Sequence, residues 1–308
     1  MTTKELEYFL AACQYGSIKT AAKKLSITSQ GLSKVIIRLE DELHTQLFFR
    51  TTKGLTPTKA AQNLAVRANI ILTEMHNIQS DFALTRSGDY RVLTVATTYG
   101  VLQYLTFQFI EEFYQAYPHI RLNLAEFPEA QIQEQLDNGK IELAFLPAPI
   151  DYSRLSGTFL TSWKHCLIIN ENHPLAQKES IAYTDLENVP LALKGRTYSV
   201  FSNNITRLLK QGVTPDIYLE TTSEYLIHAA AEQNCAVGVT LDFLAEESVK
   251  YPTVIRYFKD PECVKDVYLV HRNTVSLSAE AQCFMDFTLN WIQHKSGISA
   301  RHINLQVD

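Results

Sequence analysis

The sequence predicts a multidomain protein with an all-helical N-terminal domain that ends in a β-hairpin, a long linker helix and a C-terminal α/β domain. Residues 1–60 carry apolar stripes at helical spacing, followed by a strand-turn-strand pattern. The next thirty or so residues have no proline, and no glycine before Gly88. From Arg91 onward, short apolar strands alternate with amphipathic helices. With 308 residues, 46% of them hydrophobic, the chain is long enough for two or three cores.

Three short helical patterns begin the chain. The stripe Leu6–Cys13 ends at Gly16, a residue suited to a helix end, and Ser17 lies where the N-cap of a second helix belongs. Thr28 or Ser29 can cap a third helix, whose inward residues are Leu32, Val35, Ile36, Leu39 and Leu43. Two short helices joined by a three-residue turn form a helix-turn-helix, whose second helix enters a DNA major groove. The alternative is a small helical bundle with a solvated polar face.

A β-hairpin over residues 47–57 carries basic and hydroxyl residues at its tip, so it is expected to be a wing that touches phosphate or the minor groove. We expect Gln30 and Ser33 to read bases and the other DNA-facing residues mainly to hold phosphate. The full set of expected DNA-binding residues is Ser17, Thr28, Ser29, Gln30, Ser33, Lys34, Arg38, Arg50, Thr51, Thr52 and Lys53.

The net charge of -5 is unfavourable for a protein that binds nucleic acid, but the charge is distributed unevenly along the chain. Residues 1–60, called the head below, hold nine Lys and Arg against five Asp and Glu, whereas the remainder holds nineteen against twenty-eight. Because counterion release rewards local positive charge, only the head is expected to meet double-stranded DNA.

The linker helix carries a heptad seam formed by Ala61, Leu64, Ala68, Ile71, Met75, Ile78 and Phe82. Thr56 and Pro57 are expected to open this helix as its cap and first residue. A second copy of the chain is the simplest partner for the seam, so the pattern predicts a homodimer. The alternative is a long helix packed on its own domain.

The run AAKKLSITSQGLSKVIIRLEDELHTQLFFRTTKGLTPT resembles the DNA-binding region of LysR-type transcriptional regulators. It matches that motif at Ala21, Ala22, Leu25, Ser29, Gln30, Ser33, Leu39, Glu40, Leu43, Leu47, Phe48, Arg50, Leu55 and Thr56. It departs at Gly31, where proline, serine or alanine is usual, and glycine is expected to loosen the recognition helix by about 1 kcal/mol relative to alanine.

The resemblance implies a winged helix-turn-helix over 1–58, a dimerising linker helix over 59–88 and an effector domain over 89–308. It also implies that the effector domain is similar to periplasmic binding proteins, with one lobe over 89–161 and 268–295 and a second over 162–267. A homotetramer, and RNA polymerase as a further candidate partner, follow from the resemblance alone.

Strands are expected at 92–96, 121–126, 141–146, 166–169, 191–193, 217–220, 236–240 and 267–270, in a parallel α/β sheet. Ligands bind beyond the carboxyl ends of such strands, where helix N-termini offer N–H groups. This rule selects Thr97, Thr98, Tyr99, Phe127, Pro147, Thr197, Tyr198, Ser199, Phe201, Thr222 and Thr240 as effector-binding residues. Their hydroxyls favour a small molecule with a carboxylate or similar anion, although each residue alone is more often a cap or turn residue.

Two other functions compete with a DNA-binding regulator. An enzyme is disfavoured because no GxSxG, HExxH, Walker or GxGxxG motif is present, so no catalytic residue, cofactor or metal is expected. The five cysteines are scattered and read as reduced, mostly buried thiols. A non-catalytic solute-binding protein conflicts with the basic head and with the start MTTKELEYFL, which is not a secretory signal. We therefore expect a cytoplasmic protein without a membrane partner.

Overall fold

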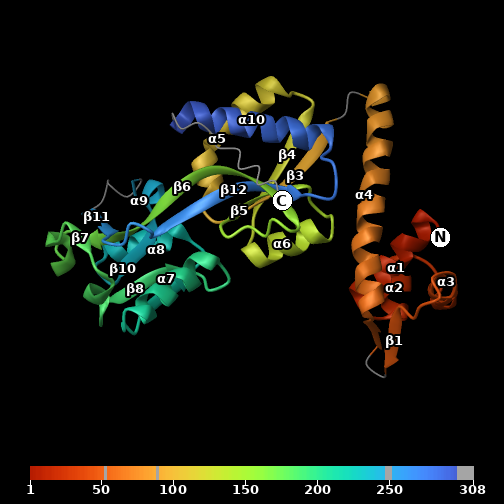
Figure 1. Cartoon of the computed structure of the whole chain (residues 1–308), viewed down its shortest axis with the longest axis horizontal. Helices are drawn as coiled ribbons and strands as arrows, with labels where there is room; N and C mark the ends of the chain where they lie inside the picture. The colour runs from red at the N-terminus through yellow and green to blue at the C-terminus, as the bar shows by residue number, and fades with distance from the viewer. Residues whose placement is uncertain (52–53, 88–89, 247–251, 297–308) are drawn as a thin grey trace. The chain divides into compact units, whose positions relative to one another are not determined.

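The computed structural model describes residues 1–51, 54–87, 90–246 and 252–296 (Figure 1). Contacts divide the chain into two compact units. The first comprises residues 1–91 with 134–142, and the second comprises residues 92–133 and the chain from 143 onward. Each unit has its own hydrophobic core.

The head begins with the three expected helices, α1 (Thr3–Tyr15), α2 (Ile18–Lys24) and α3 (Ser29–Glu42). Their ends follow local rules. Gly16 adopts the left-handed conformation, with φ 59°, and ends α1. The Ser17 hydroxyl accepts a hydrogen bond from Thr20 N at 3.4 Å, and Thr28 Oγ1 accepts one from Gly31 N at 3.0 Å. Thr28, and not Ser29, is therefore the cap of α3.

The inner face of α3 packs as predicted, with one exception. Leu32, Ile36 and Leu39 are buried in the head core together with residues of α1 and α2, and Val35 is half-buried against it. Leu43 was predicted to face inward, but this residue is the C-cap of α3 and is 36% exposed. Because α3 ends at this residue, helical periodicity no longer directs the Leu43 side chain toward the core.

The expected wing consists of β1 (Phe48–Thr51) and β2 (Gly54–Pro57), paired antiparallel from Phe48↔Pro57 to Thr51↔Gly54. The prediction that Thr56 and Pro57 open the linker helix is wrong, because both residues pair with β1. Helix α4 (Lys59–Ser87) begins after Thr58. The Thr58 hydroxyl accepts a hydrogen bond from Ala61 N at 3.1 Å and so supplies the cap.

The heptad seam of α4 changes its surroundings along the helix. Ala61 and Leu64 pack in or against the head core, and Ala68 is also buried. The next three seam residues, Ile71, Met75 and Ile78, are 38% to 48% exposed. The Phe82 side chain lies outside the described residues. The first part of the seam therefore packs within the head, and the middle part exposes apolar side chains to solvent.

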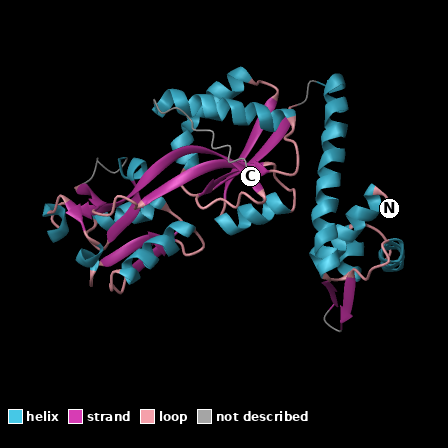
Figure 2. Cartoon of the chain, in the orientation of Figure 1, coloured by secondary structure: helices cyan, strands magenta, loops and turns pink. Residues whose placement is uncertain are grey.

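The second unit is built on a mixed sheet flanked by helices (Figure 2). Its strands are β3 (Arg91–Thr97), β4 (Ile120–Glu126), β5 (Leu143–Pro147), β6 (Leu155–Asn170), β7 (Ser180–Ile181), β8 (Pro190–Lys194), β9 (Asp216–Thr221), β10 (Val237–Leu241), β11 (Thr253–Phe258) and β12 (Val264–Arg272). The order is β4-β3-β5-β12-β6-β10-β8-β9, and β11 pairs with β6 and β7.

The expectation of a parallel sheet holds only for part of this unit. Strand β3 runs parallel to β5, and β8 runs parallel to β9 and β10. However, β12 runs antiparallel to β5 and β6, and β6 runs antiparallel to β10 and β11. The long strands β6 and β12 thus join two groups of parallel strands.

The helices of this unit are α5 (Val101–Ala116), α7 (Ser199–Lys210), α8 (Glu224–Glu232), α9 (Asp242–Glu246) and α10 (Ala279–Ser296), with short 3-10 turns at Pro174–Gln177 and Tyr183–Leu186. Helix α6 (Glu129–Asp137) begins in this unit, and its residues from Glu134 onward are assigned to the first. Helices α5 and α10 lie side by side, and Phe109 meets Phe284 and Trp291 edge-on, with ring centroids 5.7 Å and 5.3 Å apart. These rings belong to a first core, and Leu167, Leu191 and Val237 belong to a second.

None of the helices in the described residues combines the length and hydropathy needed to cross a lipid bilayer.

Candidate DNA-contacting face and effector site

Helix α3 presents a polar face to solvent. Gln30, Lys34 and Arg38 are exposed, and Ser33 is half-buried. On the wing, Arg50 is exposed. These side chains are basic, amide and hydroxyl types, which hydrogen-bond to base edges and phosphate oxygens. The face therefore has the composition of a DNA-contacting surface.

The remaining predicted DNA-binding residues differ in what the structure shows of them. Ser17 and Thr28 use their hydroxyl oxygens as helix caps, which leaves their hydroxyl hydrogens able to donate. Ser29 is exposed at the first position of α3, and Thr51 is exposed at the end of β1. Thr52 and Lys53, at the tip of the wing, lie outside the described residues.

Arg38 has a partner inside the head. Its guanidinium forms an ion pair with the carboxylate of Glu5 in α1. The Glu5 side chain is 8% exposed and that of Arg38 is 65% exposed. A guanidinium has five N–H donors, so the pair with Glu5 leaves donors that can reach phosphate. Arg38 thereby links α1 to the exposed side of α3.

The wing is fixed to the helices of the head at two places. Glu40 Oε1 accepts hydrogen bonds from Leu47 N at 2.7 Å and Phe48 N at 3.1 Å, which fixes the start of the hairpin to α3. Leu55 N donates to Gly16 O at 2.7 Å. A Cβ on Gly54, whose φ is 125°, would lie 2.4 Å from Gly16 O, so only glycine lets β2 approach α1.

Gly31 sits under the Thr28 cap. A Cβ at this position would lie 3.0 Å from Thr28 Oγ1, the atom that accepts the Gly31 N–H. The bare glycine therefore accommodates a close capping hydroxyl, which offsets part of the propensity cost predicted for it.

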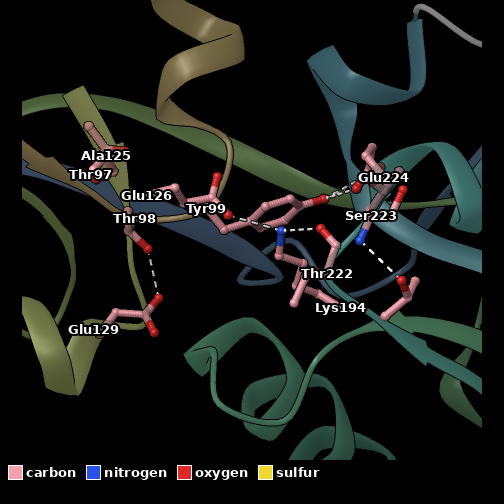
Figure 3. A network of polar contacts seen from close by, with 12 residues as sticks. Thr97, Thr98, Tyr99, Ala125, Glu126, Glu129, Lys194, Thr222, Ser223 and Glu224 are labelled. Carbon is pink, nitrogen blue, oxygen red and sulfur yellow. Dashed lines mark hydrogen bonds and ion pairs between the residues drawn. The ribbon is translucent and has the colours of Figure 1, made fainter. Parts of the chain in front are cut away.

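In the second unit, a polar network gathers at the carboxyl ends of β3, β4, β8 and β9, where the strand rule predicted a ligand site (Figure 3). The figure shows the Tyr99 ring at its centre, with Lys194 below the ring and Glu224 beyond the hydroxyl. Tyr99 itself is 1% exposed.

The Tyr99 hydroxyl joins two residues from α8 and β10. It donates to Glu224 Oε2 and lies 3.1 Å from Thr240 Oγ1, and Thr240 in turn donates to Glu224 Oε1. His228 Nε2 lies 3.2 Å from the same carboxylate. Burial, followed by the Glu224 charge, raises the pKa of Tyr99 well above its usual value. The phenol is therefore a hydrogen-bond donor at all physiological pH values.

Glu129, the first residue of α6, binds groups from two other segments. Its Oε1 accepts hydrogen bonds from Thr98 Oγ1 at 2.7 Å and Ser199 Oγ at 2.8 Å, and its Oε2 accepts one from Ser199 N at 2.9 Å. Ser199 begins α7. The N–H group and the hydroxyls predicted to hold an anionic effector are thus bound by a carboxylate of the protein.

Two buried lysines complete the network. Lys194 Nζ donates to Glu126 Oε1 at 3.0 Å and to Thr222 O at 2.9 Å. Lys265, from β12, donates to Tyr99 O at 2.7 Å and to Thr98 Oγ1 at 3.3 Å. Burial lowers the pKa of Lys265 to about 8.

The predicted effector residues divide into two groups. Those in the network are Thr98, Tyr99, Tyr198, Ser199, Thr240 and, through its carbonyl, Thr222. The other five have different surroundings. The Thr97 hydroxyl donates to Ala125 O, and the Phe127 N–H donates to Thr97 O. Pro147 lies opposite Val267 in the sheet, Thr197 is exposed in a turn, and Phe201 packs against the second core.

The charged members of the network were not predicted from the sequence. They are Glu126, Glu129, Lys194, Glu224 and Lys265. A usable signal was present: Lys194 and Glu126 directly end buried or half-buried strands, where a charged side chain points into the region that the strand rule selects.

Four of the five cysteines are at least partly shielded from solvent. Cys166 and Cys263 are buried, Cys13 and Cys283 are half-buried, and Cys235 is exposed. Burial raises the pKa of Cys13 to about 12 and also raises that of Cys166. Within the described ranges, no three His, Cys, Asp or Glu side chains group as metal ligands.

Comparisons with known proteins match both units. A profile for the "LysR substrate binding domain" matches residues 86–293, and one for "Bacterial regulatory helix-turn-helix protein, lysR family" matches residues 3–62. The chain is 27% identical over 237 residues to the transcriptional regulator CysB of Burkholderia cenocepacia, covering 75% of each protein. It is 25% identical over 256 residues to the regulator AlsR of Bacillus subtilis, covering 81% of this chain and 82% of that one.

Solved structures share the fold. A full-length OxyR variant from Pseudomonas aeruginosa aligns with a TM-score of 0.66 at 20% identity, covering 95% of both chains. Full-length CbnR, solved in complex with its target DNA, aligns with a TM-score of 0.63 at 17% identity, covering 96% of this chain and 100% of that chain. Since the profile of the effector domain alone matches most of the sequence, the chain belongs to the LysR family of transcriptional regulators.

Proposed function

We propose that this regulator reads its operator with the exposed face of α3 and holds the DNA backbone with the wing. The observation that carries the proposal is the exposure of Gln30 and Lys34 on one helix whose apolar side is buried in the head core. Gln30 is the proposed base reader, because an amide can bind adenine through two hydrogen bonds. Lys34 and Arg50, with the sequence-predicted Lys53, hold phosphate.

Binding to DNA from upstream of the protein's own gene tests this function. In an electrophoretic mobility-shift assay, we expect the affinity for this DNA to fall steeply as the salt concentration rises. A Gln30→Ala variant should bind matched and mutated operators with more nearly equal affinity. Retention of full discrimination by Gln30→Ala would show that α3 is oriented differently. A Lys210→Ala variant, altered on the exposed end of α7, serves as the control.

We propose that a small-molecule effector acts at the polar network around Tyr99 and alters DNA bending or spacing through the paired heads. The position of the network at the strand ends supports this proposal. So does the structural similarity to the effector domain of QuiR, solved with shikimate, at a TM-score of 0.57 and 17% identity over 67% of this chain and 99% of that one. The proposed lobes are residues 89–161 with 268–295, and residues 162–267.

The exposed seam residues Ile71, Met75 and Ile78 support a homodimer through α4. Sedimentation of an Ile71→Glu variant tests it, because a charge in the seam should shift the protein toward monomer. A homotetramer and a contact with RNA polymerase are further proposals from family membership, and transcription in vitro with the purified polymerase tests the latter. Catalysis forms no part of the proposed function.

A further inference from the structure

The ammonium group of Lys194 sits in a cage that has the composition of a cation-binding site. Lys194 ends β8 and is 5% exposed. Its Nζ lies 4.1 Å from the centroid of the Tyr99 ring and 4.7 Å from that of Tyr198. The Glu126 carboxylate and the Thr222 carbonyl accept its hydrogen bonds at 3.0 Å and 2.9 Å. Two aromatic faces, an anion and a carbonyl are the groups that recognise an ammonium ion.

The walls of this cage come from several strand ends. Tyr99 follows β3 and Glu126 ends β4, whereas Tyr198 and Thr222 follow β8 and β9. The cage is therefore assembled by tertiary structure. Lys194 reaches into it on a flexible four-carbon stem, so its ammonium group can leave without moving the backbone.

The rest of the network disfavours an anion. At the start of α7, the N–H and the hydroxyl of Ser199 are bound to Glu129, and the hydroxyls of Tyr99 and Thr240 are bound to Glu224. An entering carboxylate has to displace one of these fixed carboxylates and remain close to it. Three glutamates lie here with two lysines and His228, so the network offers no excess of positive charge to an anion.

We infer that the cage is an ammonium subsite that the protein occupies with its own Lys194, and that the effector carries a cationic nitrogen that replaces the Lys194 ammonium. The inference rests on the effector site proposed above and names the chemical class of its ligand. It departs from the anion that the hydroxyl residues alone suggested. Displacement of Lys194 removes the bond to Glu126 and the contact with Tyr99, so the ligand replaces a link between the strand ends.

Chemical rescue of a full-length Lys194→Ala variant tests the inference. This substitution removes three carbons and the ammonium, which together correspond to n-propylammonium. We expect n-propylammonium chloride, at millimolar concentrations, to raise the melting temperature of Lys194→Ala by roughly 2–4 °C. The same concentrations of 1-propanol or sodium propionate, at matched ionic strength, should leave it unchanged. In the wild type, the tethered Lys194 ammonium outcompetes millimolar propylammonium, which lacks the other contacts of an effector, so no shift is expected.

A shift with 1-propanol or propionate equal to that with propylammonium, or no shift with propylammonium, would overturn the inference. The double variant Lys194→Ala/Glu126→Gln is the matched control, since it lacks the carboxylate and should lose the response. If Lys194→Ala does not fold alone, the variant is refolded from urea in each of the three solutes. The fraction that recovers the folded state should then be larger in propylammonium than in propanol or propionate. Operator binding is measured separately, so failure of the rescue leaves the DNA-binding proposal standing.

Discussion

The two recognition surfaces differ in how far their polar groups are already satisfied. On the head, the side chains of Gln30, Lys34 and Arg50 are exposed to solvent. In the effector domain, Tyr99 and Lys194 are almost fully buried and bind groups of the protein itself. DNA therefore meets polar groups that already face solvent, whereas a ligand of the network has to displace contacts that stabilise the fold. The comparison predicts that substitutions in the network cost stability, and that those on the recognition face cost only binding.

The largest effect is expected from Tyr99→Ala. The ring fills a buried position and covers Lys194, and its hydroxyl bonds Glu224 and Thr240. We expect a loss of about 3–5 kcal/mol in the free energy of unfolding, measured by urea denaturation. Tyr99→Phe keeps the ring and should lose only about 1–2 kcal/mol. A loss below 1 kcal/mol for Tyr99→Ala would contradict the buried character of this site.

A smaller effect on stability is expected from Gly54→Ala, in the wing of the head. A Cβ there meets Gly16 O at 2.4 Å, and φ is 125°. We expect the head to lose about 2–3 kcal/mol and operator affinity to fall with the wing displaced. Gly212→Ala is the matched control, since Gly212 has a φ of 76° but nothing within 4 Å of the added Cβ. Equal costs at the two positions would mean that close approach to α1 does not require glycine.

The same contrast explains what the sequence could and could not reveal. Helix caps depend on neighbours within three residues, so Ser17 and the cap of α3 were predictable. The opening of α4 was mispredicted because Thr56 and Pro57 pair with β1 across the hairpin. In the network, strand ends were found one at a time, but the pairing of Glu129 with Ser199 spans 70 residues. No local pattern identifies such a partner.

The length of β6 was missed for a similar reason. Sequence periodicity indicated only residues 166–169, whereas the strand runs from Leu155 to Asn170. Its first half is mostly half-buried beside β12, and the exposed polar residues Ser162 and Lys164 interrupt the apolar run. Pairing with β12 holds this segment extended despite its weak apolar signal.

Acid should destabilise the effector domain. His165 is buried next to Asn204, and burial, with the charges of Arg207 and Lys265, lowers its pKa to about 3. Between about pH 6.5 and 3 the unfolded state binds more protons at this residue, so stability is lost as the pH falls from 6.5. We expect about 1 kcal/mol to be lost from this group by pH 5.5.

Urea denaturation at several pH values checks this assignment. A His165→Gln variant should show a flatter dependence than the wild type between pH 6.5 and 5, whereas His119→Gln, altered at an exposed position, should follow the wild type. Parallel curves for His165→Gln and the wild type would assign the acid sensitivity to other groups.

The smallest effect on stability is expected from Lys34→Ala. This variant separates the two surfaces clearly, because it should weaken DNA binding while leaving the fold intact. Lys34 is exposed, so the free energy of unfolding should change by no more than about 0.5 kcal/mol. If Lys34 neutralises one phosphate, the slope of log affinity against log salt should become shallower by about 1, with similar weakening on every DNA sequence. Lys210→Ala removes the same charge from α7 and should leave the slope unchanged. An unchanged slope for Lys34→Ala would place this part of α3 away from the DNA backbone, and a sequence-dependent loss would make Lys34 a base reader beside Gln30.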